Sequence, residues 1–167
     1  RSNFDFRWTM KGTKKKIIPH VICEPSQGVE RAFLVFMFDA YTFDKSRDNV
    51  VLKLHPNLAP VKVGVFPLVS NKKELVEKSK QIYDDLKKEM TCIFDVSGSI
   101  GRRYARADET GVYASITVDF ESFEDDSVTV RSRDTTEQIR VKIKDLKDVI
   151  SKFLDGEKLS KLGKVVE

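Results

Sequence analysis

The chain of 167 residues is long enough for one well-filled core, or for one domain with an appended segment. Its 30 lysine and arginine residues nearly balance 26 aspartate and glutamate residues, so the charge permits a nucleic-acid partner without requiring one. The longest apolar run is too short to span a bilayer, and the two cysteines lack metal-ligand spacing. Composition therefore argues against a membrane-spanning protein, a disulfide scaffold and a cysteine-based metal site.

The first part of the chain predicts a strand, a turn and a helix. Residues 17–23 are apolar and predict the strand, and Glu-Pro-Ser-Gln-Gly at 24–28 predicts the turn, because proline fixes φ and glycine is permissive. Apolar side chains at helical spacing predict a buried helix over residues 30–43. The polar residues 44–49 predict a linker. His55 has no second histidine near it, so a metal role is not expected.

The rest of the chain predicts one mixed sheet with helices packed on it. Strands are expected over residues 61–69, 91–96 and 112–120, separated by helices in residues 75–90 and 97–111. A hairpin is expected over 127–133 and 137–143, followed by an amphipathic helix over 146–154. Residues 156–167 are expected to fray. The order β-α-β-α-β-β-β-α indicates an α/β domain over residues 61–154.

Arginines gather in this domain, on one predicted helix and on the strands of the hairpin. They are Arg102, Arg103 and Arg106 on the helix, and Arg131, Arg133 and Arg140 on the strands. The planar guanidinium suits phosphate, which it binds through two parallel hydrogen bonds. Acids close in sequence could neutralise the same arginines. Structural ion pairs and an RNA-facing surface are therefore equally supported, and the glycines at 98 and 101 predict a turn rather than a phosphate cradle.

A second group of polar residues surrounds the turn at 24–28. Glu24 and Ser26 end the predicted buried strand, and Arg31 lies in the first turn of the next helix. Such an arrangement could bind an ammonium group and a nucleotide. A buried salt bridge between Glu24 and Arg31 is the simpler explanation, and from the residues alone it is the favoured one.

Together these stretches resemble one family over nearly the whole chain. The segment Ser-Gly-Ser-Ile-Gly-Arg-Arg-Tyr-Ala-Arg at 97–106, followed by Val-Asp-Phe at 118–120, resembles the anticodon-binding domain of archaeal and eukaryotic-type glycyl-tRNA synthetases. Glu-Pro-Ser-x-Gly-x-x-Arg at 24–31 is similar to motif 3 of these class II enzymes. The resemblance implies a class IIa anticodon-binding fold, a mixed five-stranded sheet with covering helices, preceded by a strand–turn–helix remnant of the catalytic domain. The implied organisation is catalytic remnant 1–48, anticodon-binding domain 49–154 and flexible tail 155–167.

The resemblance also implies site residues and partners. Glu24 and Ser26 would bind glycine; Gly28, Val29, Glu30 and Arg31 would bind ATP, with Arg31 the catalytic residue that stabilises phosphate charge. Charge makes Arg102, Arg103, Arg106, Arg131 and Arg133 the expected tRNA contacts. The full-length enzyme would use ATP with Mg²⁺, glycine and tRNA-Gly. It would be a cytoplasmic homodimer that neither binds a membrane nor holds a resident metal. No cofactor is expected to be tightly bound to this chain.

The chain also departs from the family pattern. Class II motifs 1 and 2 are absent, and Gln27 stands where the family commonly has an aromatic residue. The 167 residues are therefore expected to be a C-terminal fragment that is inactive alone. The alternative is a non-catalytic, synthetase-like module that binds nucleic acid or protein.

Overall fold

The computed structural model describes residues 8–9, 16–17 and 25–166. The chain divides into two compact units, Arg1–Phe33 and Leu34–Glu167. In the first unit the short strands β1 (Trp8–Thr9) and β2 (Lys16–Ile17) pair antiparallel. Residues 18–24, which include Glu24 and most of the expected first strand, lie outside the described residues.

The helix expected over residues 30–43 is shorter than the apolar pattern suggests. Helix α1 spans Val29–Ala40, and strand β3 (Tyr41–Asp44) follows it directly and pairs antiparallel with β4 (Asn49–Leu52). The prediction of a buried helix is wrong for this chain, because most of its large apolar side chains, Phe33 and Phe38 among them, are largely exposed. Residues 44–49 are not a linker, because they form the turn of the β3–β4 hairpin.

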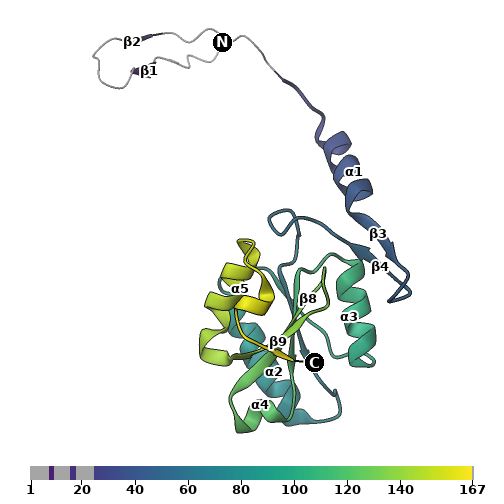
Figure 1. Ribbon diagram of the computed structural model, residues 1–167, viewed down its shortest axis with the longest axis vertical. Helices are drawn as coiled ribbons and strands as arrows, with labels where there is room; N and C mark the ends of the chain where they lie inside the picture. Colours follow the sequence, from purple (N-terminus) through teal and green to yellow (C-terminus); the bar gives the residue numbers. More distant parts are fainter. Residues whose placement is uncertain (1–7, 10–15, 18–24, 167) are drawn as a thin grey trace. The chain divides into compact units, whose positions relative to one another are not determined.

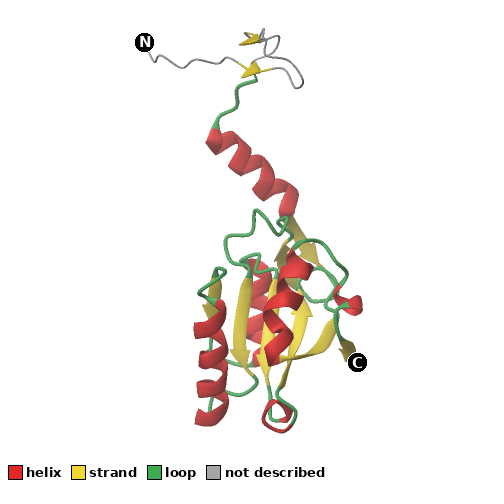
Figure 2. Ribbon diagram, turned by 90° about the vertical axis from the view of Figure 1, so that its left-hand side faces the viewer, coloured by secondary structure: helices red, strands yellow, loops and turns green. Residues whose placement is uncertain are grey.

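A six-stranded mixed sheet forms the centre of the second unit (Figures 1 and 2). Its strands lie in the order β10-β9-β8-β7-β5-β6, with β5 parallel to β6 and β7 and all other pairs antiparallel. The strands are β5 (Val63–Pro67), β6 (Cys92–Phe94), β7 (Ala114–Val118), β8 (Ser127–Ser132), β9 (Gln138–Lys142) and β10 (Lys164–Val166). The helical elements are α2 (Lys73–Leu86), α3 (Ile100–Glu109), α4 (Glu121–Glu124), η1 (Ile143–Asp145), α5 (Leu146–Leu154) and η2 (Leu159–Lys161).

The two faces of the sheet differ in chemistry. On the first face, valine and isoleucine side chains such as Val65, Ile116 and Val130 pack against α2 and α5 and form the main core. On the second face, α3 covers only the β5 side, where Phe66 packs beside Ala107. Strand side chains alternate between faces, so the register puts polar residues of β7, β8 and β9 together on this second face. They are Ser115, Thr117, Thr129, Arg131, Gln138 and Arg140.

The sheet has one strand more than the five that were expected. The sixth strand is β10, which pairs antiparallel with β9 and comes from the segment expected as a flexible tail. Leu159, in η2, is buried against the main core and anchors that segment. The expected boundary between residues 48 and 49 falls in the turn of the β3–β4 hairpin, whereas the two compact units divide after Phe33.

Candidate functional site

Helix α3 begins where the parallel strands end, and it holds three of the expected arginines, Arg102 and Arg103 in its first turn and Arg106 in its last. Ser99 caps the helix, its hydroxyl accepting a hydrogen bond from the backbone N–H of Arg102 at 3.4 Å. Gly98, which precedes the cap, has φ of +73°, a conformation that favours glycine. It therefore forms part of the turn before the helix, as expected. Arg103 points inward and is only 1% exposed.

The guanidinium of Arg103 binds backbone carbonyls rather than a carboxylate. It donates to the carbonyl oxygen of Pro67 at the end of β5, and to that of Gly98 at 3.0 Å. Burial lowers the pKa of Arg103 from its ordinary value. The side chain therefore joins the ends of β5 and β6 to α3, which is a structural role.

Arg131 is also held inside the fold. Its two terminal nitrogens donate to the two carboxylate oxygens of Asp108, each at 3.0 Å, and Asp108 is only 2% exposed. Arg47, in the β3–β4 turn, adds a third bond to the same carboxylate at 3.2 Å and donates to the carbonyl of Arg133 at 2.7 Å. The guanidinium of Arg131 also lies 4.8 Å from the centre of the Tyr104 ring. This network ties the hairpin to α3 and β8.

Arg133 completes the internal set. Its guanidinium donates to the carbonyl of Gly111 at 3.0 Å and to that of Leu54 at 2.7 Å, and pairs with Asp134 at 2.8 Å. For Arg103, Arg131 and Arg133 the geometry thus favours the structural alternative. These side chains fix the shape of the domain, since their terminal guanidinium nitrogens already have acceptors within it; the buried Nε of Arg103 has no partner among the described residues.

Arg102 and Arg106 remain accessible on α3. Arg102 is exposed, and the side chain of Arg106 is 43% exposed although it pairs with Asp95, its Nε lying 3.1 Å from the carboxylate. Burial raises the pKa of Asp95, but the bonds from the Ser97 N–H and Arg106 outweigh it and hold that pKa below its ordinary value. Of these two cations on α3, Arg106 is thus paired with a carboxylate, and Arg102 is the more exposed one.

A hollow of about 780 Å³ opens beside these elements, at the carboxyl end of β7. Phe120 lies two residues beyond the end of β7, at the edge of the hollow, and is 53% exposed. The other lining residues come from the β5 end, α4, the polar face of the sheet and β10: Leu68, Asp119, Glu121, Asp125, Thr129, Arg140, Lys164, Val165 and Val166. The hollow thus combines an exposed aromatic ring with cationic and anionic groups.

An ion-paired cluster forms the floor of this hollow. The guanidinium of Arg140 donates to both oxygens of Asp119, one of them at 2.9 Å, and its Nε donates to the Ser127 hydroxyl at 2.6 Å. Hydrogen bonding to Asp119 raises the pKa of Arg140. Burial raises the pKa of Asp119, but the bonds from Arg140 and Ser122 more than compensate and lower it. Both groups are therefore charged at neutral pH and hold each other in place.

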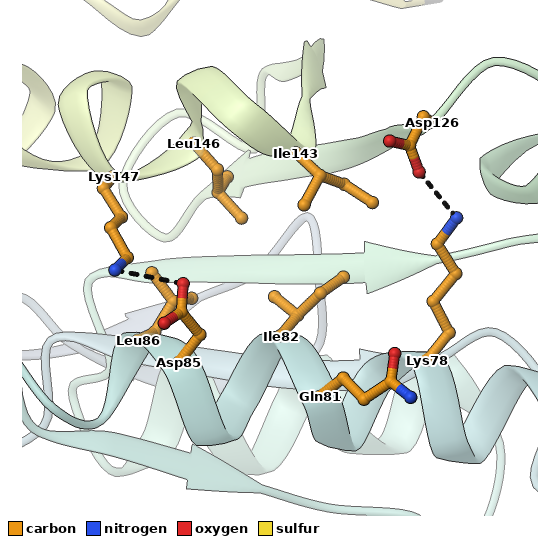
Figure 3. Close-up of a pocket in the computed structure, with 9 residues that line it drawn as sticks. All are labelled: Lys78, Gln81, Ile82, Asp85, Leu86, Asp126, Ile143, Leu146 and Lys147. Atoms are coloured by element: carbon orange, nitrogen blue, oxygen red, sulfur yellow. Dashed lines mark hydrogen bonds and ion pairs between the residues drawn. The ribbon is translucent and has the colours of Figure 1, made fainter.

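A second, smaller cavity of about 290 Å³ lies on the other face of the sheet, between α2 and the η1–α5 segment (Figure 3). Its floor is apolar, and a lysine–aspartate pair stands at each end, Lys78 with Asp126 at 2.9 Å and Lys147 with Asp85 at 3.0 Å. Both lysines are already paired. This cavity therefore offers less to a nucleic acid than the hollow on the polar face.

The other predicted site, at residues 24–31, is described only in part. Ser26, Gly28, Val29, Glu30 and Arg31 are all exposed, and α1 begins at Val29. Glu24 lies outside the described residues. A helix N-terminus and a guanidinium group are both chemically suited to anions. Among the described residues, no group of three or more His, Cys, Asp or Glu side chains is arranged to hold a metal ion.

Sequence comparison adds independent information. Residues 62–153 match the family described as the anticodon binding domain. Over 160 residues, 95% of this chain, the sequence is 49% identical to the glycine–tRNA ligase of Caldanaerobacter subterraneus subsp. tengcongensis. It is 41% identical over 159 residues, 94% of the chain, to the glycine–tRNA ligase of Aeropyrum pernix.

The chain spans only part of these relatives. The alignments cover 33% of the Caldanaerobacter protein and 27% of the Aeropyrum protein. A third relative, the glycine–tRNA ligase of Malacoplasma penetrans, is 50% identical over 80% of this chain and 29% of its own length. In the described ranges, no helix is both long and apolar enough to cross a membrane.

Proposed function

Because the chain belongs to the family of anticodon-binding domains, we propose that it is part of a glycine–tRNA ligase and binds the anticodon region of tRNA-Gly. The observation that carries this proposal is the hollow at the carboxyl end of β7, which joins the exposed Phe120 ring to the charged pair of Asp119 and Arg140. Proteins commonly recognise RNA in single-stranded loops by stacking bases on aromatic rings and bonding their polar edges.

Each group in the hollow has a distinct role in this proposal. Phe120 stacks on an unpaired anticodon base. The carboxylate of Asp119 accepts hydrogen bonds from amino groups on the base edge, and Arg140, whose donors have acceptors within the domain, holds that carboxylate in place. Because Asp119 and Arg140 orient each other, they are positioned before the RNA arrives.

In the same proposal, Arg102 and Arg106 contact phosphates of the RNA backbone. Both lie on α3, which starts at the sheet edge where β5, β6 and β7 end, and the hollow opens at that edge. Phosphate contacts position an RNA without specifying its sequence, whereas base contacts specify it. The arginines would therefore set affinity, and the hollow would set discrimination.

Residues 24–31 belong, in this proposal, to the site where the longer protein activates glycine. Arg31 and the first N–H groups of α1 would stabilise the phosphates of ATP, whose Mg²⁺ would neutralise part of their charge. Glu24 and Ser26 would bind glycine. We further propose that the longer protein is a cytoplasmic homodimer and that these 167 residues alone do not aminoacylate tRNA.

Binding measurements test the anticodon proposal directly. A tRNA-Gly transcript and the same transcript with a substituted anticodon are titrated with the chain, and tRNA-Gly should bind more tightly. Phe120→Ala should weaken the binding of tRNA-Gly by about 1–3 kcal/mol, the contribution of one stacked base. Phe43→Ala is the matched control, since Phe43 is also 53% exposed but lies in β3 and does not line the hollow.

Two outcomes would contradict the proposal. Equal affinity of the unmodified chain for both transcripts would show that the chain does not recognise the anticodon. If Phe120→Ala and Phe43→Ala changed the affinity for tRNA-Gly equally, anticodon recognition would still stand, but the hollow would not be the site of it.

A further inference from the structure

Strand β10 lies outside the part of the chain that matches the anticodon-binding family, yet it is built firmly into the sheet. The family match ends at residue 153, and β10 spans Lys164–Val166. Leu159 is buried just before the strand. At Gly163 a β-carbon would lie 2.9 Å from the carbonyl oxygen of Arg140, so the chain approaches β9 closely there. The residues that follow therefore have a defined position.

The register of β10 directs Lys164 toward the hollow. Lys164 lies opposite Arg140, which lies opposite Thr129, and Thr129 lies opposite Thr117. Paired residues in a sheet share a face, so all four side chains belong to the polar face that carries the hollow. Lys164 lines the hollow beside Arg140, Val165 and Val166.

Lys164 differs from the other cations around the cavities in its charge balance. The charge of Arg140 is compensated by Asp119 and Asp125, and Lys78 and Lys147 are paired with aspartates at the second cavity. Among the described residues, Lys164 has no carboxylate within salt-bridge distance, and it is exposed. It is thus a cation without a salt-bridge partner among the described residues, at the rim of a hollow whose Arg140 is already paired.

We propose that β10 is an additional RNA-binding element of this protein, and that Lys164 contacts a backbone phosphate next to the base held in the hollow. This inference rests on the proposed binding of an anticodon loop at the hollow. A lysine is a compact point charge on a flexible stem, which suits a phosphate whose position varies between RNAs. Lys164 therefore contributes affinity and salt dependence rather than base discrimination.

The test compares Lys164→Ala with Lys161→Ala by titration of tRNA-Gly at several salt concentrations. Lys161 is a matched control, because it is exposed, lies three residues upstream in η2 and does not line the hollow. Lys164→Ala should weaken binding roughly fivefold at low salt and reduce the slope of log affinity against log salt by about one. Lys164→Arg should restore both, and Lys161→Ala should change neither.

The outcomes separate this inference from the proposed function. If the unmodified chain binds tRNA-Gly with anticodon preference but Lys164→Ala and Lys161→Ala behave alike, the role of β10 is refuted and the anticodon proposal stands. If the unmodified chain shows no anticodon preference, the anticodon proposal itself fails, and this inference fails with it. Thermal unfolding of Lys164→Ala should match that of the unmodified chain, since the side chain is exposed; a large loss of stability would instead give Lys164 a structural role.

Discussion

Removing the carboxylate of Asp108 should destabilise the domain far more than removing an exposed charge on the same helix. Asp108 accepts two hydrogen bonds from Arg131 and one from Arg47, and all three side chains are mostly inaccessible to solvent. In Asp108→Ala, Arg131 would lose its buried ion-pair partner, and Arg47 would keep its pair with Asp44 at 3.0 Å. Breaking a buried ion pair from one side costs about 3–5 kcal/mol. For a protein of this size that corresponds to a decrease in Tm of roughly 10 °C.

Urea unfolding followed by far-UV circular dichroism measures this cost. Arg106→Ala is the control, because its pair with Asp95 is partly exposed, and such pairs contribute about 0–1 kcal/mol. The double variant Asp108→Leu/Arg131→Met should recover part of the loss, since it removes both members of the buried pair. If Asp108→Ala costs no more than Arg106→Ala, the network does not hold the domain together.

Three further predictions concern single positions. Gly111 has φ of +76°, and a β-carbon there would lie 3.2 Å from a carbonyl oxygen of β4. Gly111→Ala should therefore lower the free energy of unfolding, measured in urea, by about 1–3 kcal/mol. An unchanged unfolding midpoint would show that the β-carbon causes no backbone strain. The hydrogen bond from the Ser127 hydroxyl lowers the pKa of Asp125 to about 2. Because this pKa is below the unfolded value of about 3.9, the stabilisation is complete above pH 4 and is lost as the pH falls toward 2. Between pH 4 and pH 2, Asp125→Asn should therefore lose less stability than the unmodified chain. Parallel curves of stability against pH for the two proteins would refute a lowered pKa at Asp125. Burial raises the pKa of Cys92 to about 11. In a Cys23→Ser chain, the Cys92 thiol should therefore react with iodoacetamide much more slowly at pH 8 than a free cysteine does. An equal rate would show that the Cys92 thiol is not shielded.

The order of elements in the sheet domain could be predicted because its apolar pattern is local. The apolar pattern in residues 112–120 and the hairpin pattern in 127–143 give β7, β8 and β9 in the expected order, and helix α3 lies within the expected range 97–111. The sixth strand was missed because Lys164–Val166 is too short to show a period. An edge strand of this length is determined by the partner strand rather than by its own sequence.

The arginines show where local reasoning stops. Charge alone does not reveal whether a guanidinium lies inside or outside, and Arg131 and Arg133 lie inside because their acceptors come from distant parts of the chain. Arg47 was assigned to a linker on polar composition, although it bonds Asp108, 61 residues away. Phe120 was included in the expected strand and in the segment that carries the family resemblance, but not among the expected RNA contacts; its exposure depends on where β7 ends.

The strand order has a consequence for how the chain acquires its structure during synthesis. Strand β5, which lies next to the edge strand β6, is the first strand of this sheet to be made, and both of its neighbours, β6 and β7, are made later and reach it through helical crossovers. Parallel pairing between distant segments is intrinsically slow, because loop-closure entropy is lost before any contact compensates it. The apolar side chains of β5 thus remain exposed on the ribosome until residues beyond 118 have emerged. Substitutions that weaken β7 should therefore lower the yield of folded protein, through aggregation of incomplete chains, more than they lower its final stability.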